Sequence, residues 1–485
     1  MSLKIAFFPH NQPHTKFFSY VADLLKKEDD IDSLFVKEVG RIEGQEVFQF
    51  EVELEKIWGD IDISSKALGV LQRKYPDFDF MRALYSEREF NYYPYFFGSK
   101  AVSSNHQLKY LVGCFEVFNT WLDIVSIDFI VSELIIGMAD GVLKEVSERR
   151  AVPYYSFRQS KMIPGVVVCN SYYDEPLDMA DLYQEYVDNG IPQEIKRRAE
   201  EHINSLKYRI EHPSYMELTK KPLKITPFKI VRSIFRGLME LNKVKDVTSL
   251  TIRKKPRVEA YKMILQRVIN IYRMRKNHKK WFTKEITKND KYIIYPLHYE
   301  PEASTLVRAF RFSDQLALIK QITKALPLDV MLVVKEHGGN RGYRKTEFYR
   351  ELSYMPNVVL RPPEYSVTDL ISNCLCVITL TGRMGWEAIV NDKPVITLGR
   401  SYWSSFDMVY NVQSPKGISD AIAECHHSSG NSDVDMNKLL PFTSAYINCV
   451  HKANFVINGE SFMTENNINA FRHILLGLIL SRYQA

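Results

Sequence analysis

Lysine, glutamate, histidine and two glycines follow an apolar run in "LVVKEHGGNRGYR", which spans Leu332–Arg344. On a strand, Lys335 and His337 are two residues apart and therefore share one face. An ammonium group and an imidazole beside a glycine-rich turn suit a phosphate or a carboxylate. A surface turn with a structural histidine explains the same residues, so this stretch alone leaves both interpretations open.

A second stretch, "TLTGRMGWEA", places two glycines directly after an apolar run, at the start of a predicted helix. The free N–H groups and the dipole at a helix N-terminus stabilise a phosphate. Beside Gly382 and Gly385, Arg383 would add a positive charge and Thr381 a hydroxyl. Glu387, about one turn into the helix, is placed to accept hydrogen bonds from a ribose. The alternative is a tight strand–helix turn with an acidic residue in its first turn.

Carboxylates and a further histidine gather in "YPLHYEPEAST", which contributes His298, Glu300 and Glu302. Together with Glu336 and His337 these residues are of the types that bind metal ions. Their spacing does not match His-Glu-x-x-His, and no Asp-x-Asp accompanies them. We therefore predict a site without metal.

These stretches lie at strand ends in a predicted α/β domain that covers residues 291–450. Short apolar runs alternate there with amphipathic helical segments, as in a doubly wound parallel sheet. Five successive polar or glycine-rich loops follow the predicted strands, and the third of them, "RPPEYS", ends in Ser366. Ligands bind at the carboxyl ends of strands in such sheets, so we expect these loops to surround one ligand.

The rest of the chain divides into three further parts. Residues 1–200 alternate between strand and helix patterns, which predicts a second parallel α/β domain. Residues 201–290 have apolar residues at helical spacing and long basic faces, which predicts a helical insertion. Residues 451–485 contain a strong helix that we expect to pack back across both domains.

Charge is distributed unevenly along the chain. Residues 220–290 contain 21 Lys/Arg against 5 Asp/Glu, a net charge of +16, whereas the whole chain carries +6. A basic block in an otherwise acidic chain predicts an anionic partner, and we favour an anionic membrane surface or glycan over nucleic acid. A solvated helical face is the alternative. Six scattered cysteines without a CxxC pair favour reduced thiols in a cytoplasmic protein.

The three stretches, in this order and with "TGRMGWEAIVNDKPVITLG" complete, resemble the bacterial capsule polysaccharide biosynthesis proteins, a family that includes the Kdo transferases. The resemblance is good over about residues 291–405 and weak in the N-terminal half. It implies a GT-B-like fold, in which two Rossmann-like parallel-sheet domains face a cleft, here with a basic α-helical insertion. The family's Lys-Glu-His-Pro sequence is matched at Lys335, Glu336 and His337, with Gly338 in place of the proline. The Glu-Asp-Gly-Phe motif of the β-Kdo transferases is absent.

The resemblance implies that the nucleotide of a sugar donor binds the C-terminal domain and the acceptor binds the N-terminal one. We expect the nucleotide and its phosphates to contact His298, Glu302, Lys335, His337, Ser366, Thr381, Gly382, Arg383, Gly385 and Glu387.

The N-terminal domain should supply the catalytic group. Glu133 and Asp128, assigned to the end of a predicted strand, are candidates for the acidic residue that activates the acceptor hydroxyl or attacks the anomeric carbon. His10, after the first strand, is another candidate. Arg158 is the candidate for binding an acidic acceptor.

We therefore expect a metal-independent glycosyltransferase that moves a sugar from a nucleotide donor, CMP- or UDP-linked, to a growing capsule- or lipopolysaccharide-type glycan or lipid-linked glycan. It would need no other cofactor and would be cytoplasmic, peripheral on the inner face of the cytoplasmic membrane through residues 220–290. Two alternatives remain open. One is a CDP-linked polyol-phosphate transferase of the teichoic-acid type, and the other is a non-catalytic glycan-binding scaffold.

Overall fold

A computed structural model describes most of the 485-residue chain. The described residues are 3–37, 42–91, 102–207, 266 and 269–484, the last range with gaps at 275, 278–279, 283–284, 288, 301, 341, 343, 429–433, 458 and 460. Most of the predicted basic insertion therefore lies outside the described residues.

The N-terminal domain is built on a six-stranded sheet in the order β3-β2-β1-β4-β5-β6. All neighbouring pairs are parallel except β5 and β6, which are antiparallel. The strands are β1 (Lys4–Phe8), β2 (Asp32–Lys37), β3 (Glu46–Gln49), β4 (Phe129–Ser132), β5 (Tyr154–Gln159) and β6 (Val166–Cys169).

Helices cover both faces of this sheet, which explains why its central strands β1 and β4 are apolar at all but one position each. In β1, Ile5 and Phe7 pack with the side chains of α1 and α21. Ala6, the residue between them, packs on the opposite face among side chains of α2, α7 and α8. The helices of this part of the chain are α1 (Gln12–Asp29), α2 (Phe50–Ile57), α3 (Ser65–Lys74), α4 (Phe80–Ser86), α5 (Arg88–Asn91), α7 (Ser104–Ile124), α8 (Met138–Glu148), α9 (Met179–Asn189) and α10 (Gln193–Lys207).

The C-terminal domain has a six-stranded sheet in the order β12-β11-β10-β7-β8-β9, with every neighbouring pair parallel. The chain runs outward from β7 to β9 on one side, then returns to β10 and runs outward on the other. The strand order thus reverses between β7 and β10, the position where doubly wound sheets bind ligands. The strands are β7 (Lys291–Pro296), β8 (Val330–Lys335), β9 (Val358–Arg361), β10 (Val377–Thr379), β11 (Val395–Thr397) and β12 (Val409–Asn411).

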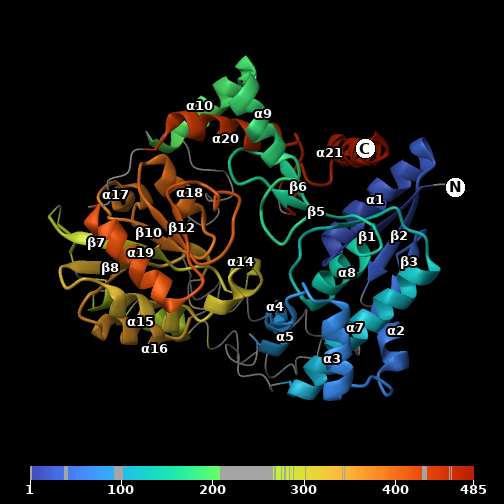
Figure 1. Ribbon diagram of the computed structural model, residues 1–485, viewed down its shortest axis with the longest axis horizontal. Helices are drawn as coiled ribbons and strands as arrows, with labels where there is room; N and C mark the ends of the chain where they lie inside the picture. The colour runs from blue at the N-terminus through green and yellow to red at the C-terminus, as the bar shows by residue number, and fades with distance from the viewer. Residues whose placement is uncertain are drawn as a thin grey trace.

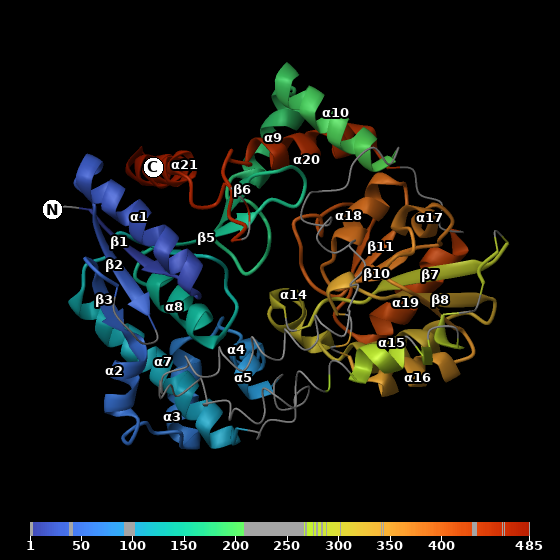
Figure 2. The ribbon, with the colours of Figure 1, turned by 180° about the vertical axis from the view of Figure 1, so that it is seen from behind.

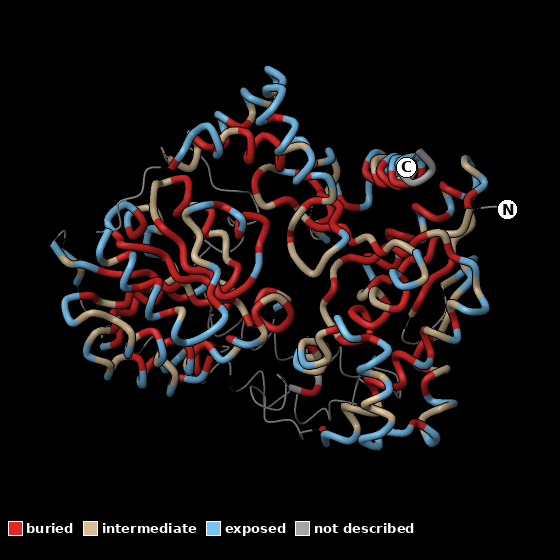
Figure 3. The backbone as a smooth tube through the Cα atoms, viewed as in Figure 1, coloured by how far each residue is buried: buried red, intermediate tan, exposed pale blue. Residues whose placement is uncertain are grey.

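Short helices follow most of these strands and lie on both faces of the sheet (Figure 1). They are α14 (Ala303–Leu306), η1 (Phe310–Phe312), α15 (Gln315–Ala325), η2 (Gly338–Asn340), α16 (Thr346–Tyr354), α17 (Val367–Ser372), α18 (Arg383–Val390) and α19 (Pro415–His427), followed by α20 (Met436–Asn448) and α21 (Glu465–Gln484). Figure 3 shows that buried residues follow the strands of both domains. The two sheets with their covering helices confirm the predicted GT-B-like class.

The two domains share an apolar core where α9 and α10 meet α20 and α18 (Figure 2). Met162 and Ile203 of the N-terminal half pack in the same cluster as Trp386 and Tyr446 of the C-terminal half. Trp386 Nε1 also donates a hydrogen bond to His202 Nε2 at 3.3 Å. The domains are therefore joined along one side by packed helices and not only by a linker.

The last helix, α21, lies against α1 of the N-terminal domain. Phe471 is fully buried and packs edge-on against Phe17, with ring centroids 4.8 Å apart. Arg472 forms an ion pair with Asp29 at 2.5 Å.

The C-terminal core includes a residue that precedes β7. Trp281 stacks on Tyr349 in this core, so the domain begins earlier than residue 291.

All six cysteines are free thiols. Among the described helices, none combines the length and the apolar character that a membrane crossing needs.

Replacing Phe471 by alanine should lower the free energy of unfolding by about 3–5 kcal/mol, because it empties a fully buried aromatic site. Chemical denaturation of the full chain measures this. Leu480→Ala, on the exposed face of the same helix, is the matched control and should change stability by less than about 0.5 kcal/mol. Equal effects of the two substitutions would show that α21 is not part of the core.

Candidate functional site

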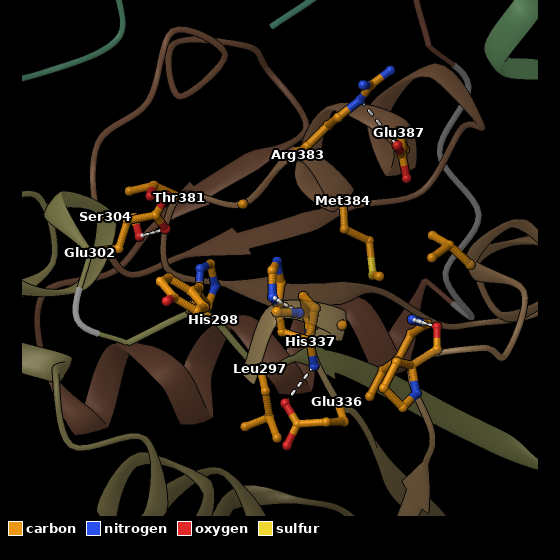
Figure 4. Close-up of a pocket in the computed structure, with 18 of the residues that line it drawn as sticks. Leu297, His298, Glu302, Ser304, Glu336, His337, Thr381, Arg383, Met384 and Glu387 are labelled. Carbon is orange, nitrogen blue, oxygen red and sulfur yellow. Dashed lines mark hydrogen bonds and ion pairs between the residues drawn. The ribbon is translucent and has the colours of Figure 1, made fainter. Parts of the chain in front are cut away.

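A pocket of about 1030 Å³ lies at the carboxyl ends of the C-terminal strands. All five loops predicted to surround a ligand contribute to its wall, and Lys161 and Asp174 add the N-terminal domain. Figure 4 shows part of the lining. Nine of the ten residues predicted to contact the nucleotide line it: His298, Glu302, Lys335, His337, Ser366, Thr381, Gly382, Arg383 and Glu387.

Lys335 and His337 reach the pocket from the end of β8. Lys335 Nζ donates to the carbonyl oxygen of Pro363 at 3.0 Å, and burial lowers the pKa of this lysine. His337 Nδ1 accepts the Gly339 N–H at 3.1 Å, which places the proton of a neutral ring on Nε2. Burial also lowers the pKa of His337. The loop thus offers one ammonium group and one neutral N–H donor to an anion.

His298, after β7, joins the two sides of the sheet. Its Nε2 accepts the backbone N–H of Leu380 at 3.1 Å and lies 3.0 Å from Thr379 Oγ1. Burial, with the nearby His337 and Arg344, lowers the pKa of His298 to about 3. The ring is therefore neutral and acts as a permanent acceptor that holds the β10–α18 turn.

Glycines at the start of α18 serve close packing. A Cβ atom on Gly382 would lie 2.8 Å from Thr379 Oγ1 and 3.0 Å from His298 Cε1. A Cβ atom on Gly385 would lie 2.5 Å from the indole ring of Trp403. Gly385 does not line the pocket, so the expectation that it contacts the nucleotide is corrected: it makes room for an aromatic side chain.

Arg383 and Glu387 lie one turn apart on α18 and face each other across 3.2 Å (Figure 4). Burial raises the pKa of Glu387, while Arg383 and Lys335 oppose this. The carboxylate is therefore placed between two cations and remains at the pocket wall as a hydrogen-bond acceptor.

A buried network behind the pocket holds the β7 and β8 loops together, and sequence reasoning missed it. Arg344 forms an ion pair with Glu300 at 2.7 Å and a longer one with Glu336 at 3.4 Å. Asn340 Nδ2 donates to the carbonyl oxygen of His298 at 3.0 Å. Two of the three carboxylates considered as metal ligands, Glu300 and Glu336, thus pair with an arginine. In the described part of the chain, no three His, Cys, Asp or Glu side chains form a metal-binding group.

His10 and Glu133 come together at the carboxyl ends of β1 and β4. The His10 backbone N–H donates to Glu133 Oε1 at 2.9 Å, and its ring Nε2 lies 3.0 Å from Asp140 Oδ1. Burial lowers the pKa of His10, but the carboxylates of Asp140 and Glu133 outweigh it and raise this pKa to about 9. At neutral pH His10 is therefore a cation. Neither residue lines the large pocket.

The structure places two N-terminal candidates differently from the prediction. Asp128 precedes β4, where its Oδ2 accepts the backbone N–H of Lys4 at 2.7 Å. It therefore lies at the amino end of β4, whereas Glu133 and His10 lie at the carboxyl ends of the strands.

Arg158 is the second corrected residue. It lies within β5, is buried, and pairs with Asp174 at 2.5 Å. It is an internal ion-pair partner and not an exposed group for an acidic acceptor.

Asp174 connects the two domains at the pocket. Its second carboxylate oxygen contacts Arg308 of the C-terminal domain. Burial raises the pKa of Asp174, but Arg308 and Arg158 outweigh this and hold the pKa well below its usual range. Sequence reasoning had no signal for this pairing, because the partners lie 134 residues apart.

Comparison with known proteins supports the resemblance seen in the sequence. The family model described as "Capsule polysaccharide biosynthesis protein" matches residues 250–413, which include the stretches on which the resemblance rests. No curated protein matches the chain.

Solved structures of similar proteins include a β-Kdo 2,7 transferase, KpsC of Thermosulfurimonas dismutans, with 13% identity, a TM-score of 0.33 and coverage of 79% of this chain and 88% of that one. A UDP-GlcNAc 2-epimerase of Methanocaldococcus jannaschii in complex with UDP-GlcNAc and UDP has 13% identity, a TM-score of 0.27 and coverage of 90% and 98%. These TM-scores are low, so the fold class rests on the strand orders of the two sheets.

Stability should depend on pH through His10. Its pKa rises from an ordinary 6.5 to about 9 on folding, so its stabilising contribution is complete below pH 6.5 and is lost as the pH rises to about 9. The slope from one such group is at most about 1.4 kcal/mol per pH unit. Urea unfolding of wild type and His10→Gln between pH 6 and 9.5 measures it, and the difference between them should shrink as the pH rises.

His427→Gln, an exposed histidine at the end of α19, is the control and should follow the wild-type curve. A difference between wild type and His10→Gln that stays constant over this range would contradict the charged state of His10.

Proposed function

We propose that the protein is a metal-independent glycosyltransferase that moves a sugar from a nucleotide donor to a growing bacterial surface polysaccharide. One observation carries the proposal. Residues from four loops, chosen from the sequence for nucleotide binding, meet in one pocket at the point where the strand order reverses, and the fifth predicted loop completes its wall. The match of residues 250–413 to a capsule polysaccharide biosynthesis family supports the same conclusion.

The pocket residues fit the two parts of a nucleotide. Lys335 and the Nε2–H of His337 would bind phosphate oxygens and stabilise the charge that develops as the nucleotide leaves. Glu387 and Ser366, which also line the pocket, would form hydrogen bonds with the ribose and base. This division uses fixed cations and N–H donors of the chain and requires no metal ion.

The acceptor would approach from the N-terminal domain. Glu133 and His10 are its candidate catalytic groups, since they lie at the carboxyl end of that domain's sheet. His10, as a cation, would stabilise negative charge or donate a proton, and Glu133 is the candidate base or nucleophile. The basic residues 220–290 lie mostly outside the described part of the chain, and their attraction to an anionic membrane surface stays a prediction.

Nucleotide binding tests the pocket assignment. Titration calorimetry with UMP, UDP, CMP, CDP and GDP should give saturable binding for at least one base. For that nucleotide, His337→Ala should weaken binding about 10–100-fold, because a hydrogen bond to an ionised group contributes about 1.5–3 kcal/mol. Glu387→Ala should weaken it at least severalfold through loss of the ribose contact.

His427→Ala, outside the pocket, is the matched histidine control and should bind as the wild type does. Unchanged nucleotide affinity in both His337→Ala and Glu387→Ala would contradict the assignment of this pocket as the nucleotide site. Absence of binding by every nucleotide to the wild type would overturn the glycosyltransferase proposal in favour of a non-catalytic protein.

A further inference from the structure

The pocket contains two buried polar groups that have no protein partner near the interface with the N-terminal domain. Arg308 and Thr381 both line the pocket, and each is less than one-tenth exposed. Arg308 Nε and Thr381 Oγ1 have no hydrogen-bond partner among the described atoms. Buried polar groups are normally hydrogen-bonded, so two such groups in one cavity are available to the oxygen atoms of a ligand.

The backbone of Arg308 and the methyl group of Thr381 lie against the same glycine. A Cβ atom on Gly399 would lie 2.8 Å from Thr381 Cγ2 and 2.9 Å from the carbonyl oxygen of Arg308. Both residues thus flank the same glycine after β11, which explains why no larger side chain fits there. Figure 4 shows Thr381 beside Ser304 and Glu302 at one side of the pocket, with Glu387 at the other.

Arg308 is held in place from the other domain. One of its terminal nitrogens contacts Asp174, which is itself fixed by Arg158 at 2.5 Å. Asp174 accepts from both guanidinium groups and leaves Arg308 Nε unused. The group formed by Arg158, Asp174 and Arg308 carries a net positive charge of one, and Lys161 adds a second cation near Asp174. Glu302, beside Thr381, is the carboxylate on the opposite side of this end of the pocket.

We propose that Arg308 and Thr381 form a second oxyanion subsite, separate from Lys335 and His337, for a group that the sugar donor carries beyond its first phosphate. The inference rests on the proposed function and adds a specificity determinant to it. The oxyanion is either the second phosphate of a nucleoside diphosphate or a carboxylate of the transferred sugar, since both present oxygens that accept from Arg Nε and a hydroxyl. Asp174 acts as a positioning residue for Arg308.

Paired ligands that differ by one oxyanion test the subsite. UMP and UDP differ by the second phosphate, and UDP-glucose and UDP-glucuronate differ by a carboxylate. We expect one of the two pairs to show tighter binding of the more acidic member by about tenfold or more, as for a charge-assisted hydrogen bond. Arg308→Met and Thr381→Val should each reduce that ratio towards one.

Thermal unfolding of Thr381→Val shows whether a loss of binding comes from the missing hydroxyl or from a less stable fold. Its hydroxyl has no partner in the free protein, so its removal should leave the thermal midpoint unchanged or raised. Arg308→Met also removes the ion pair with Asp174 and is expected to lower the midpoint.

The outcomes distinguish this inference from the proposed function. Failure of all four ligands to bind wild type, together with the other bases of the panel, would overturn both. Binding in which neither acidic group raises the affinity, or in which the gain survives both substitutions, would overturn the second subsite alone. A gain in the UMP/UDP pair that both variants lose assigns the subsite to phosphate, and the same result in the glucose/glucuronate pair assigns it to carboxylate.

Discussion

The hydrogen bond from the Leu380 N–H to His298 Nε2 joins the two halves of the C-terminal sheet at the point where its strand order reverses. One half ends in the β7 and β8 loops and the other in the β10–α18 turn, and the pocket lies between them. The bond requires an unprotonated Nε2, and burial secures this by lowering the pKa of His298 to about 3. The position of Gly382, and with it the start of α18, depends on this neutral ring.

A second layer keeps His298 in place. Asn340 and Gln315 both hydrogen-bond the His298 backbone, and Arg344 bridges Glu300 and Glu336 behind it. The apolar strands thus determine where the loops begin, and buried polar bonds between loops determine their shape. Loss of one member of such a network lowers the stability of the fold, because its partners are then buried without a hydrogen bond or an opposite charge.

The sequence was informative where function follows strand order and uninformative where it depends on long-range pairing. Polar loops after apolar runs identified nine pocket residues, since parallel strands bring their carboxyl ends to one edge. Gly385 was misjudged because glycine spacing does not distinguish a ligand contact from packing against Trp403. Asp128 was misjudged because an apolar run bounded by acidic residues gives no exact strand start.

Arg158, Asp174 and Arg308 show a different limit. Local patterns identify their charge but not their partners, which come from two domains. Once paired, Asp174 fixes the distance between the domains at the pocket, while the shared core of α10, α18 and α20 fixes them on the other side. The positions of Lys161 and Asp174, which face the pocket from the N-terminal domain, are therefore determined by the same contacts that hold the domains together. A ligand that bound Arg308 would act directly on this interdomain link, so its occupancy and the domain arrangement are physically coupled.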